Sequence, residues 1–289
     1  MTEKPADIRM IECPRDAMQG WKVFIPTQRK VDYMQQLLKV GFDTIDCGSF
    51  VSAKAIPQME DTKEVLGRLH LDGSRSKLLA IVANVRGARE AADYEIISYL
   101  GFPFSVSPTF QKRNINHTID QSLDDVRAIK SIGEGKGKEP VIYISMAFGN
   151  PYQDPFSEEL VLQWIEKIVA EGIRIISLAD TVGMATPQQV GSLTMAVMEA
   201  FPSIDIGLHL HSTAVNWQQK LAVALQAGCR RFDGALKGIG GCPMANDDLV
   251  GNMDSALMIP YFEERGYYTS VDRQQLAQSI AMAETIFVA

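Results

Sequence analysis

Short apolar runs recur at regular intervals along the chain, and amphipathic stretches lie between them. In these stretches apolar residues return every three or four positions, the period of a helix with one buried face, and a glycine or proline often ends the pattern. The runs occupy residues 8–13, 42–47, 77–82, 103–108, 141–148, 173–180, 205–211 and 229–235. Eight strands that alternate with helices predict repeated β-α units and a parallel sheet.

The number of units favours a closed (β/α)8 TIM barrel over an open doubly wound sheet, because the chain has 289 residues and no long linker. No G-x-G-x-x-G motif follows the first strand, which argues against dinucleotide binding. We expect residues 1–289 to form one catalytic barrel domain, in which 243–289 complete the last βα unit and add C-terminal helices. The segment "GEGKGK" at 133–138 lacks the end of a P-loop and is expected to be a flexible surface loop.

Composition narrows the functional class. A net charge of −7 and a pI near 5.2 argue against nucleic acid as a partner, since phosphate backbones select basic surfaces. No stretch reaches the ~20 apolar residues of a membrane span. The four cysteines have no C-x-x-C spacing and the first residues have no apolar signal core, which predicts a reduced, cytoplasmic protein.

Polar residues finish almost every predicted strand. Active sites of such barrels form at the carboxyl ends of the strands, so these residues are expected to gather at one mouth. They include Arg15, Asp16, Asp46, Ser49, Lys54, Gln111, Lys112, Arg113, Asn114, Asp180, Thr181, His209, His211 and Cys242.

His209 and His211 are two of only four histidines in the chain. Residues two apart on a strand face the same way, and with Asp16 they would form a two-histidine, one-carboxylate set with open positions. Such a set accepts Mg²⁺, Mn²⁺, Zn²⁺ or Fe²⁺. The alternative is a pair of hydrogen-bonded histidines in the core or at the rim.

Arg15 and the cysteine loop each have two interpretations. Arg15 could form only a surface ion pair with Asp16, but a guanidinium at the barrel mouth is well placed to stabilise an oxyanion, with Asp46 as the residue that holds it. The loop "GIGGCPMAN" could close over the site and carry the Cys242 thiol to a substrate, or its glycines could serve only the turn. Asn252, further along, could add a carbonyl oxygen ligand.

Six motifs together resemble the 3-hydroxy-3-methylglutaryl-CoA lyases, which are related to isopropylmalate and citramalate synthases. They run in family order over nearly the whole chain: "PRDAMQ" (14–19), "SFVSAKAIPQM" (49–59), "FQKRNIN" (110–116), "LADTVGMATP" (178–187), "HLHS" (209–212) and "GIGGCP" (238–243). The second, third and last motifs are typical of the lyases rather than the synthases.

The resemblance implies a (β/α)8 barrel that holds Mg²⁺ or Mn²⁺, with Zn²⁺ as an alternative, through Asp16, His209, His211 and Asn252. It implies cleavage of a 3-hydroxyacyl-CoA to acetyl-CoA and a ketone product, acetoacetate. His209 or Asp16 would be the base, Arg15 would stabilise the enolate, and Cys242 would support its protonation. Asp180 matches an aspartate near the substrate. Asp46, Ser49, Asn114 and Thr181 are candidate substrate contacts, and Lys22, Lys54, Lys112 and Arg113 are candidates for the CoA phosphates. The family is also expected to be homodimeric.

Three departures from the family bear on the substrate. Ala17 replaces a glycine, and Asp46 replaces a glutamate, which predicts a lost or water-mediated contact with Arg15. Ser212 replaces the aspartate of "H-x-H-D-T", which predicts weaker metal binding or less basic histidines, because a carboxylate behind the ligands is missing.

Two alternatives stay open at this point. One is a related metal-dependent aldolase or synthase that acts on a different acyl-CoA or 2-oxo acid. The other is a non-catalytic barrel that binds a ligand or partner, for which the changes at Asp46 and Ser212 are the only support.

Overall fold

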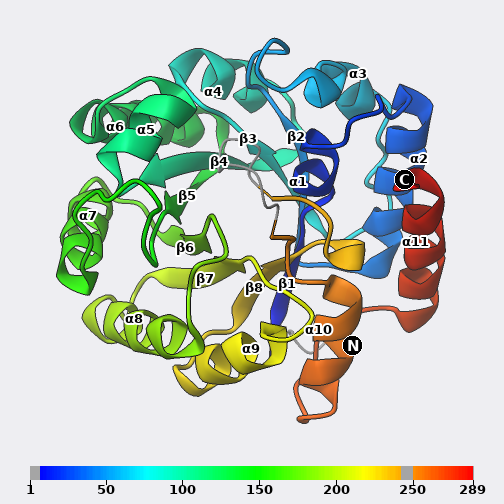
Figure 1. The fold of residues 1–289 in the computed structure, drawn as a ribbon. Helices are drawn as coiled ribbons and strands as arrows, with labels where there is room; N and C mark the ends of the chain where they lie inside the picture. Colours follow the sequence, from blue (N-terminus) through cyan, green and yellow to red (C-terminus); the bar gives the residue numbers. More distant parts are fainter. Residues whose placement is uncertain (1–6, 242–249, 289) are drawn as a thin grey trace.

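Eight parallel strands close into a barrel in chain order in the computed structural model, which describes residues 7–241 and 250–288. The barrel closes because β1 pairs in parallel with both β2 and β8, and the helices surround it (Figure 1). The strands are β1 (Arg9–Glu12), β2 (Thr44–Ser49), β3 (Lys77–Ile81), β4 (Ile97–Ser105), β5 (Glu139–Ser145), β6 (Ile175–Asp180), β7 (Asp205–Leu210) and β8 (Arg231–Gly234). The predicted (β/α)8 barrel is confirmed.

Helices link the strands and follow the last one. They are α1 (Pro14–Gln19), α2 (Thr27–Val40), α3 (Thr62–Gly67), α4 (Val85–Ala92), α5 (Pro108–Ile115), α6 (Ile119–Lys136), α7 (Glu158–Ala170), α8 (Pro187–Ala200), α9 (Trp217–Gln226), α10 (Ser255–Glu263) and α11 (Arg273–Ile286), with 3₁₀ turns η1 (Pro57–Met59) and η2 (Leu236–Gly238). The C-terminal α11 packs against α2 (Figure 1). In the described ranges no helix has the length and apolar character needed to cross a bilayer.

Two predicted segments differ from the structure. The fourth strand begins at Ile97 and ends at Ser105, not at 103–108, because Ser107 and Pro108 start α5: the Ser107 hydroxyl accepts a hydrogen bond from the Phe110 N–H at 3.1 Å. The "GEGKGK" segment is not a flexible loop either. Its first four residues form the last turn of α6, which Gly137 ends in the left-handed region at φ 65°.

The interior of the barrel is filled by alternate residues of neighbouring strands. One buried cluster comprises Leu79, Ile81, Tyr99, Val141, Tyr143 and Ile175. The intervening residues of the same strands, such as Leu78, Ile142 and Ile144, belong to the larger core that includes the helices. This alternation follows from the period of two along each strand, and it also turns His209 of β7 inward against Tyr143.

Glu12 joins β1 to the C-terminal part of the chain. Its side chain is fully buried; Oε1 accepts from the Leu236 N–H at 2.8 Å, and Oε2 lies 2.5 Å from the Ser255 hydroxyl. Burial outweighs these hydrogen bonds and raises the pKa of Glu12 from its ordinary value of 4.5 to about 8. The folded protein therefore binds a proton here that the unfolded chain releases.

The free energy of unfolding should fall as the pH rises from 4.5 to about 8. In this window the unfolded chain has released the Glu12 proton while the folded protein still binds it. Glu12→Gln keeps both hydrogen bonds without the charge, so its Tm should fall less between pH 6 and pH 9, by about 5 °C. Thermal unfolding monitored by circular dichroism measures this difference. Parallel Tm profiles of the two proteins would contradict it.

Candidate active site

The turn from β1 into α1 places two charged residues at the barrel mouth. Pro14 is the first residue of α1, a position that its fixed φ suits and where no N–H is needed. Arg15 and Asp16 therefore lie in the first helical turn, directly after the strand, and both are more than nine-tenths buried. The interpretation of Arg15 and Asp16 as a solvent-exposed ion pair is therefore wrong.

Asp16, His209 and His211 converge on one point. Each offers a ligand atom, and these atoms all lie within 4.8 Å of one another. Nε2 of His211 is buried and has no hydrogen-bond partner in the described chain, a costly state for a polar nitrogen. A cation between the three side chains would satisfy it. Nitrogen and carboxylate donors without a thiolate suit Mg²⁺, Mn²⁺ or Zn²⁺, so the residues fit a divalent metal.

The protonation states of Asp16 and His211 agree with such a site. Burial alone would raise the pKa of Asp16, but the charges of Arg15 and the histidines lower it to about 2. Burial, together with repulsion from His209, lowers the pKa of His211 to about 4. Asp16 is therefore ionised and His211 is neutral at pH 7, the forms in which they can bind a metal.

Asn252 reaches the same cluster from the segment before α10. Its backbone forms an antiparallel bridge with His211, and its amide nitrogen donates to Asp16 Oδ2 at 2.7 Å. The side chain thus lies next to Asp16, one of the three converging residues. Coordination by its carbonyl oxygen remains a prediction.

Asp233 places a carboxylate next to His209, which Ser212 cannot provide. Nδ1 of His209 lies 3.2 Å from Oδ2 of Asp233, a fully buried side chain on β8. Burial alone would lower the pKa of His209, but the bond to Asp233 and the charge of Asp16 raise it. The predicted lack of a supporting carboxylate at the ligands is therefore wrong for His209. Asp233 was missed because it lies within an apolar run.

Arg15 is held by direct contacts with Asp46. Its Nε donates to Asp46 Oδ2 at 3.0 Å and its Nη2 donates to the same oxygen, while Nη1 donates to Asp16 Oδ1 at 3.0 Å and Gln19 Oε1 at 2.8 Å. The expectation that the shorter Asp46 would lose this contact or reach Arg15 through water is wrong. Burial raises the pKa of Asp46 to about 6 despite the guanidinium.

Gln19 is a further residue that the sequence did not single out. Its amide nitrogen donates to Asp16 Oδ1 at 2.7 Å while its oxygen accepts from Arg15. Its position three and four residues after Asp16 and Arg15 on α1 was the available signal, since such spacing places side chains on one helix face.

Asp180, which the resemblance placed near the substrate, is paired with other residues of the protein instead. Its Oδ2 accepts from Nζ of the fully buried Lys220 at 2.7 Å, and its Oδ1 accepts from the Ala185 N–H at 3.1 Å. The same Lys220 ammonium donates to the backbone carbonyl of His211 at 2.8 Å. Asp180 therefore supports the His211 backbone through Lys220 and does not line the cavity. Lys220 was missed because it falls on the buried face of α9.

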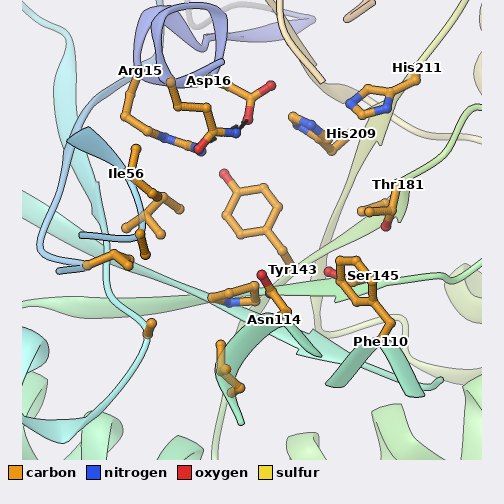
Figure 2. Close-up of a pocket in the computed structure, with 18 residues that line it drawn as sticks. Arg15, Asp16, Ile56, Phe110, Asn114, Tyr143, Ser145, Thr181, His209 and His211 are labelled. Atoms are coloured by element: carbon orange, nitrogen blue, oxygen red, sulfur yellow. Dashed lines mark hydrogen bonds and ion pairs between the residues drawn. The ribbon is translucent and has the colours of Figure 1, made fainter. Parts of the chain in front are cut away.

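A cavity of about 150 Å³ opens beside this cluster. Figure 2 shows Arg15, Asp16, His209 and His211 along one side, with Tyr143 pointing toward them from below. Asn114, Ser145 and Thr181 add polar atoms, and the remaining wall is mostly apolar, with residues that include Val51, Ile56, Ile81 and Phe110. The space thus combines a charged end with an apolar wall.

The other predicted substrate contacts divide into three groups. Asn114 and Thr181 line the cavity, whereas Ser49 is buried beside it and its hydroxyl accepts from the Val51 N–H. Lys22, Lys54, Lys112 and Arg113 are exposed and do not line it. Cys242 lies outside the described residues.

Comparisons with known proteins agree with this geometry. The model of the HMGL-like family matches residues 10–282. The cytoplasmic 3-hydroxy-3-methylglutaryl-CoA lyase of Rattus norvegicus is 32% identical over 279 residues, 95% of this chain and 80% of that protein. Hydroxymethylglutaryl-CoA lyase YngG of Bacillus subtilis is 31% identical over 94% of this chain and 90% of its own length. An HMG-CoA lyase from Acinetobacter baumannii, solved with coenzyme A and 3-methylmalate, superposes with a TM-score of 0.90, 31% identity, and coverage of 99% and 93% of the two chains.

His211→Ala should weaken Mn²⁺ binding at least about 10-fold, because it removes a ligand and not only a supporting residue. The matched control is His117→Ala, since His117 pairs with Asp125 outside the cluster. Titration of the metal-free protein with Mn²⁺, followed by electron paramagnetic resonance, measures the affinity. Equal affinities for the His211→Ala protein and wild type would rule out the ligand role.

Proposed function

Because the chain belongs to the HMGL-like family, we propose that it is a divalent-metal-dependent carbon–carbon lyase. Its substrate is 3-hydroxy-3-methylglutaryl-CoA or a similar 3-hydroxyacyl-CoA, and its products are acetyl-CoA and a ketone, acetoacetate. The observation that carries the proposal is the convergence of Asp16, His209 and His211 beside a buried arginine at one cavity. The names of the relatives, and the CoA bound to the Acinetobacter protein, support an acyl-CoA substrate.

Asp16, His209 and His211, with Asn252, would hold the metal. When bound, Mg²⁺ or Mn²⁺ would lower the pKa of a substrate hydroxyl and would hold a substrate oxygen in position.

The chain's own residues account for proton and charge movements. His209 or Asp16, both at the cavity, accepts the proton of the C3 hydroxyl. The C2–C3 bond then breaks, C3 becomes a ketone, and its electron pair passes to the thioester as an enolate. Arg15, fixed by Asp46 and Gln19, lies where it can stabilise the enolate oxygen. The enolate is protonated at C2, the step in which we expect Cys242 to take part.

Several assignments extend this proposal beyond the cavity. Lys22, Lys54, Lys112 and Arg113 are proposed to contact the CoA phosphates, since each is exposed and carries a cationic group. A homodimer is proposed from the family resemblance, and a cytoplasmic location from the cysteines without C-x-x-C spacing.

Purified protein with Mg²⁺ or Mn²⁺ should convert 3-hydroxy-3-methylglutaryl-CoA to equal amounts of acetyl-CoA and acetoacetate, and EDTA should abolish the reaction. Chromatography of the CoA species and an enzymatic acetoacetate assay measure both products. A parallel incubation with acetyl-CoA and 2-oxo acids tests the synthase alternative. Condensation without cleavage, or no reaction in either mixture, would refute the proposal.

Asp46→Asn should lower kcat about 10- to 100-fold with little change in KM, because Arg15 loses its charged acceptor and its fixed orientation. Asp46→Glu keeps the carboxylate, so it should retain more activity than Asp46→Asn. Steady-state kinetics of the three proteins at pH 8 compare them while Asp46 is ionised. An Asp46→Asn protein with wild-type kcat would show that Asp46 does not position Arg15 for catalysis.

A further inference from the structure

Tyr143 lies on the floor of the cavity, on the interior face of β5. Its side chain belongs to the buried cluster inside the barrel and is 8% exposed. The ring meets His209 edge to face, with centroids 5.9 Å apart, and Figure 2 shows the hydroxyl pointing up toward Arg15 and Asp16. The position of this phenol is therefore fixed by the packing of its ring in the barrel interior.

The Tyr143 hydroxyl is buried and has no hydrogen-bond partner within the described ranges of the chain. A buried hydroxyl without a partner is costly, and folded proteins rarely keep one. Tyr99, the other tyrosine of the same interior cluster, shows the usual arrangement, since its hydroxyl oxygen accepts from Lys77 Nζ at 2.9 Å. The buried Thr194 hydroxyl also lacks a described partner, but Tyr143 lines the cavity and Thr194 does not. This position indicates that the Tyr143 hydroxyl is kept for a ligand in the cavity.

Arg15 has few donors left for that ligand. A guanidinium carries five N–H groups. Nε and one Nη2 hydrogen go to Asp46, and the two Nη1 hydrogens go to Asp16 and Gln19. Among contacts with described residues, one N–H remains. An enolate oxygen carries a negative charge that a single donor stabilises incompletely, and effective oxyanion sites aim two donors at it.

We propose that the Tyr143 hydroxyl is the second donor: it gives a hydrogen bond to the thioester oxygen of the acyl-CoA that becomes the enolate oxygen, beside Arg15. This inference rests on the proposed lyase function. No proton is transferred from Tyr143. When the C2–C3 bond breaks, its electron pair moves through C1 to this oxygen, and both hydrogen bonds strengthen until a proton arrives at C2. Tyr143 is thus a catalytic residue that touches the substrate.

Hydrogen–deuterium exchange at the methyl group of acetyl-CoA isolates this step. The exchange forms the same enolate but needs no cleavage, so it is independent of which 3-hydroxyacyl-CoA the enzyme splits. Metal-loaded wild type, Tyr143→Phe and Tyr99→Phe would be incubated with acetyl-CoA in D₂O, and deuterium uptake would be followed by NMR. Cleavage of 3-hydroxy-3-methylglutaryl-CoA, Mn²⁺ affinity and Tm would be measured on the same proteins.

Tyr143→Phe should exchange about 100-fold more slowly than wild type, the usual effect of losing one oxyanion donor, while Mn²⁺ affinity is unchanged. Its Tm should stay the same or rise, since the substitution removes an unpaired hydroxyl. Tyr99→Phe should exchange within about 2-fold of wild type and lose some thermal stability, because it leaves Lys77 without its partner.

Exchange by Tyr143→Phe at the wild-type rate would overturn the inference, and so would slow exchange accompanied by a lower Tm or weaker Mn²⁺ binding, which would indicate a structural role. Absence of exchange in the wild type would overturn it too. A wild type that exchanges acetyl-CoA but does not cleave 3-hydroxy-3-methylglutaryl-CoA would refute the proposed function alone. In that case slower exchange by Tyr143→Phe would still support the role of Tyr143.

Discussion

Arg15 lies between two buried carboxylates, and the arrangement of the barrel mouth depends on this contact. Asp46 receives two of its N–H groups and Asp16 receives a third. Taking one cation and two carboxylates out of water is costly unless their charges are balanced and their hydrogen bonds are made. With both carboxylates ionised, one negative charge is left over, and it lies beside the two histidines. A divalent cation there would offset this negative charge and use the unpaired Nε2 of His211.

The rest of the structure serves to hold this group of charges in place. The barrel places the end of β1 next to β2 and pairs β7 with β8, His209 opposite Asp233. This is why Asp46 and Asp233 can support Arg15 and His209 from neighbouring strands. Lys220 ties the His211 carbonyl to Asp180, and Asn252 links Asp16 to the segment before α10. Each of these side chains, or its backbone, is thus held by a residue from another strand, helix or segment of the chain. Such support keeps the site geometry within the narrow limits that metal binding and catalysis require.

The strands and the common direction of His209 and His211 could be predicted from the sequence because both depend on local periodicity. The alternation of β and α segments predicted the fold, and the i, i+2 spacing of His209 and His211 predicted that both rings lie on one side. The sequence pattern did not identify Asp233, Lys220 or Tyr143. Each occupies a buried position at which the pattern of its strand or helix predicts an apolar core residue. The contact between Arg15 and Asp46 depends on how closely α1 approaches β2, which cannot be judged from side-chain length alone. The start of β4 was misplaced because Gly101 and Pro103 interrupt its apolar run, although Gly101 leaves room for Ile81 and Leu79.

The central claim is that Asp16, His209 and His211 surround a single divalent cation at the mouth of the barrel. The most direct test is a crystal structure of the Mn²⁺-soaked protein, with anomalous difference density recorded at the manganese absorption edge. The account predicts one strong peak within about 2.0–2.4 Å of a carboxylate oxygen of Asp16 and a ring nitrogen of each histidine. A saturated crystal with no peak among these three side chains, or with the manganese bound elsewhere, would contradict it.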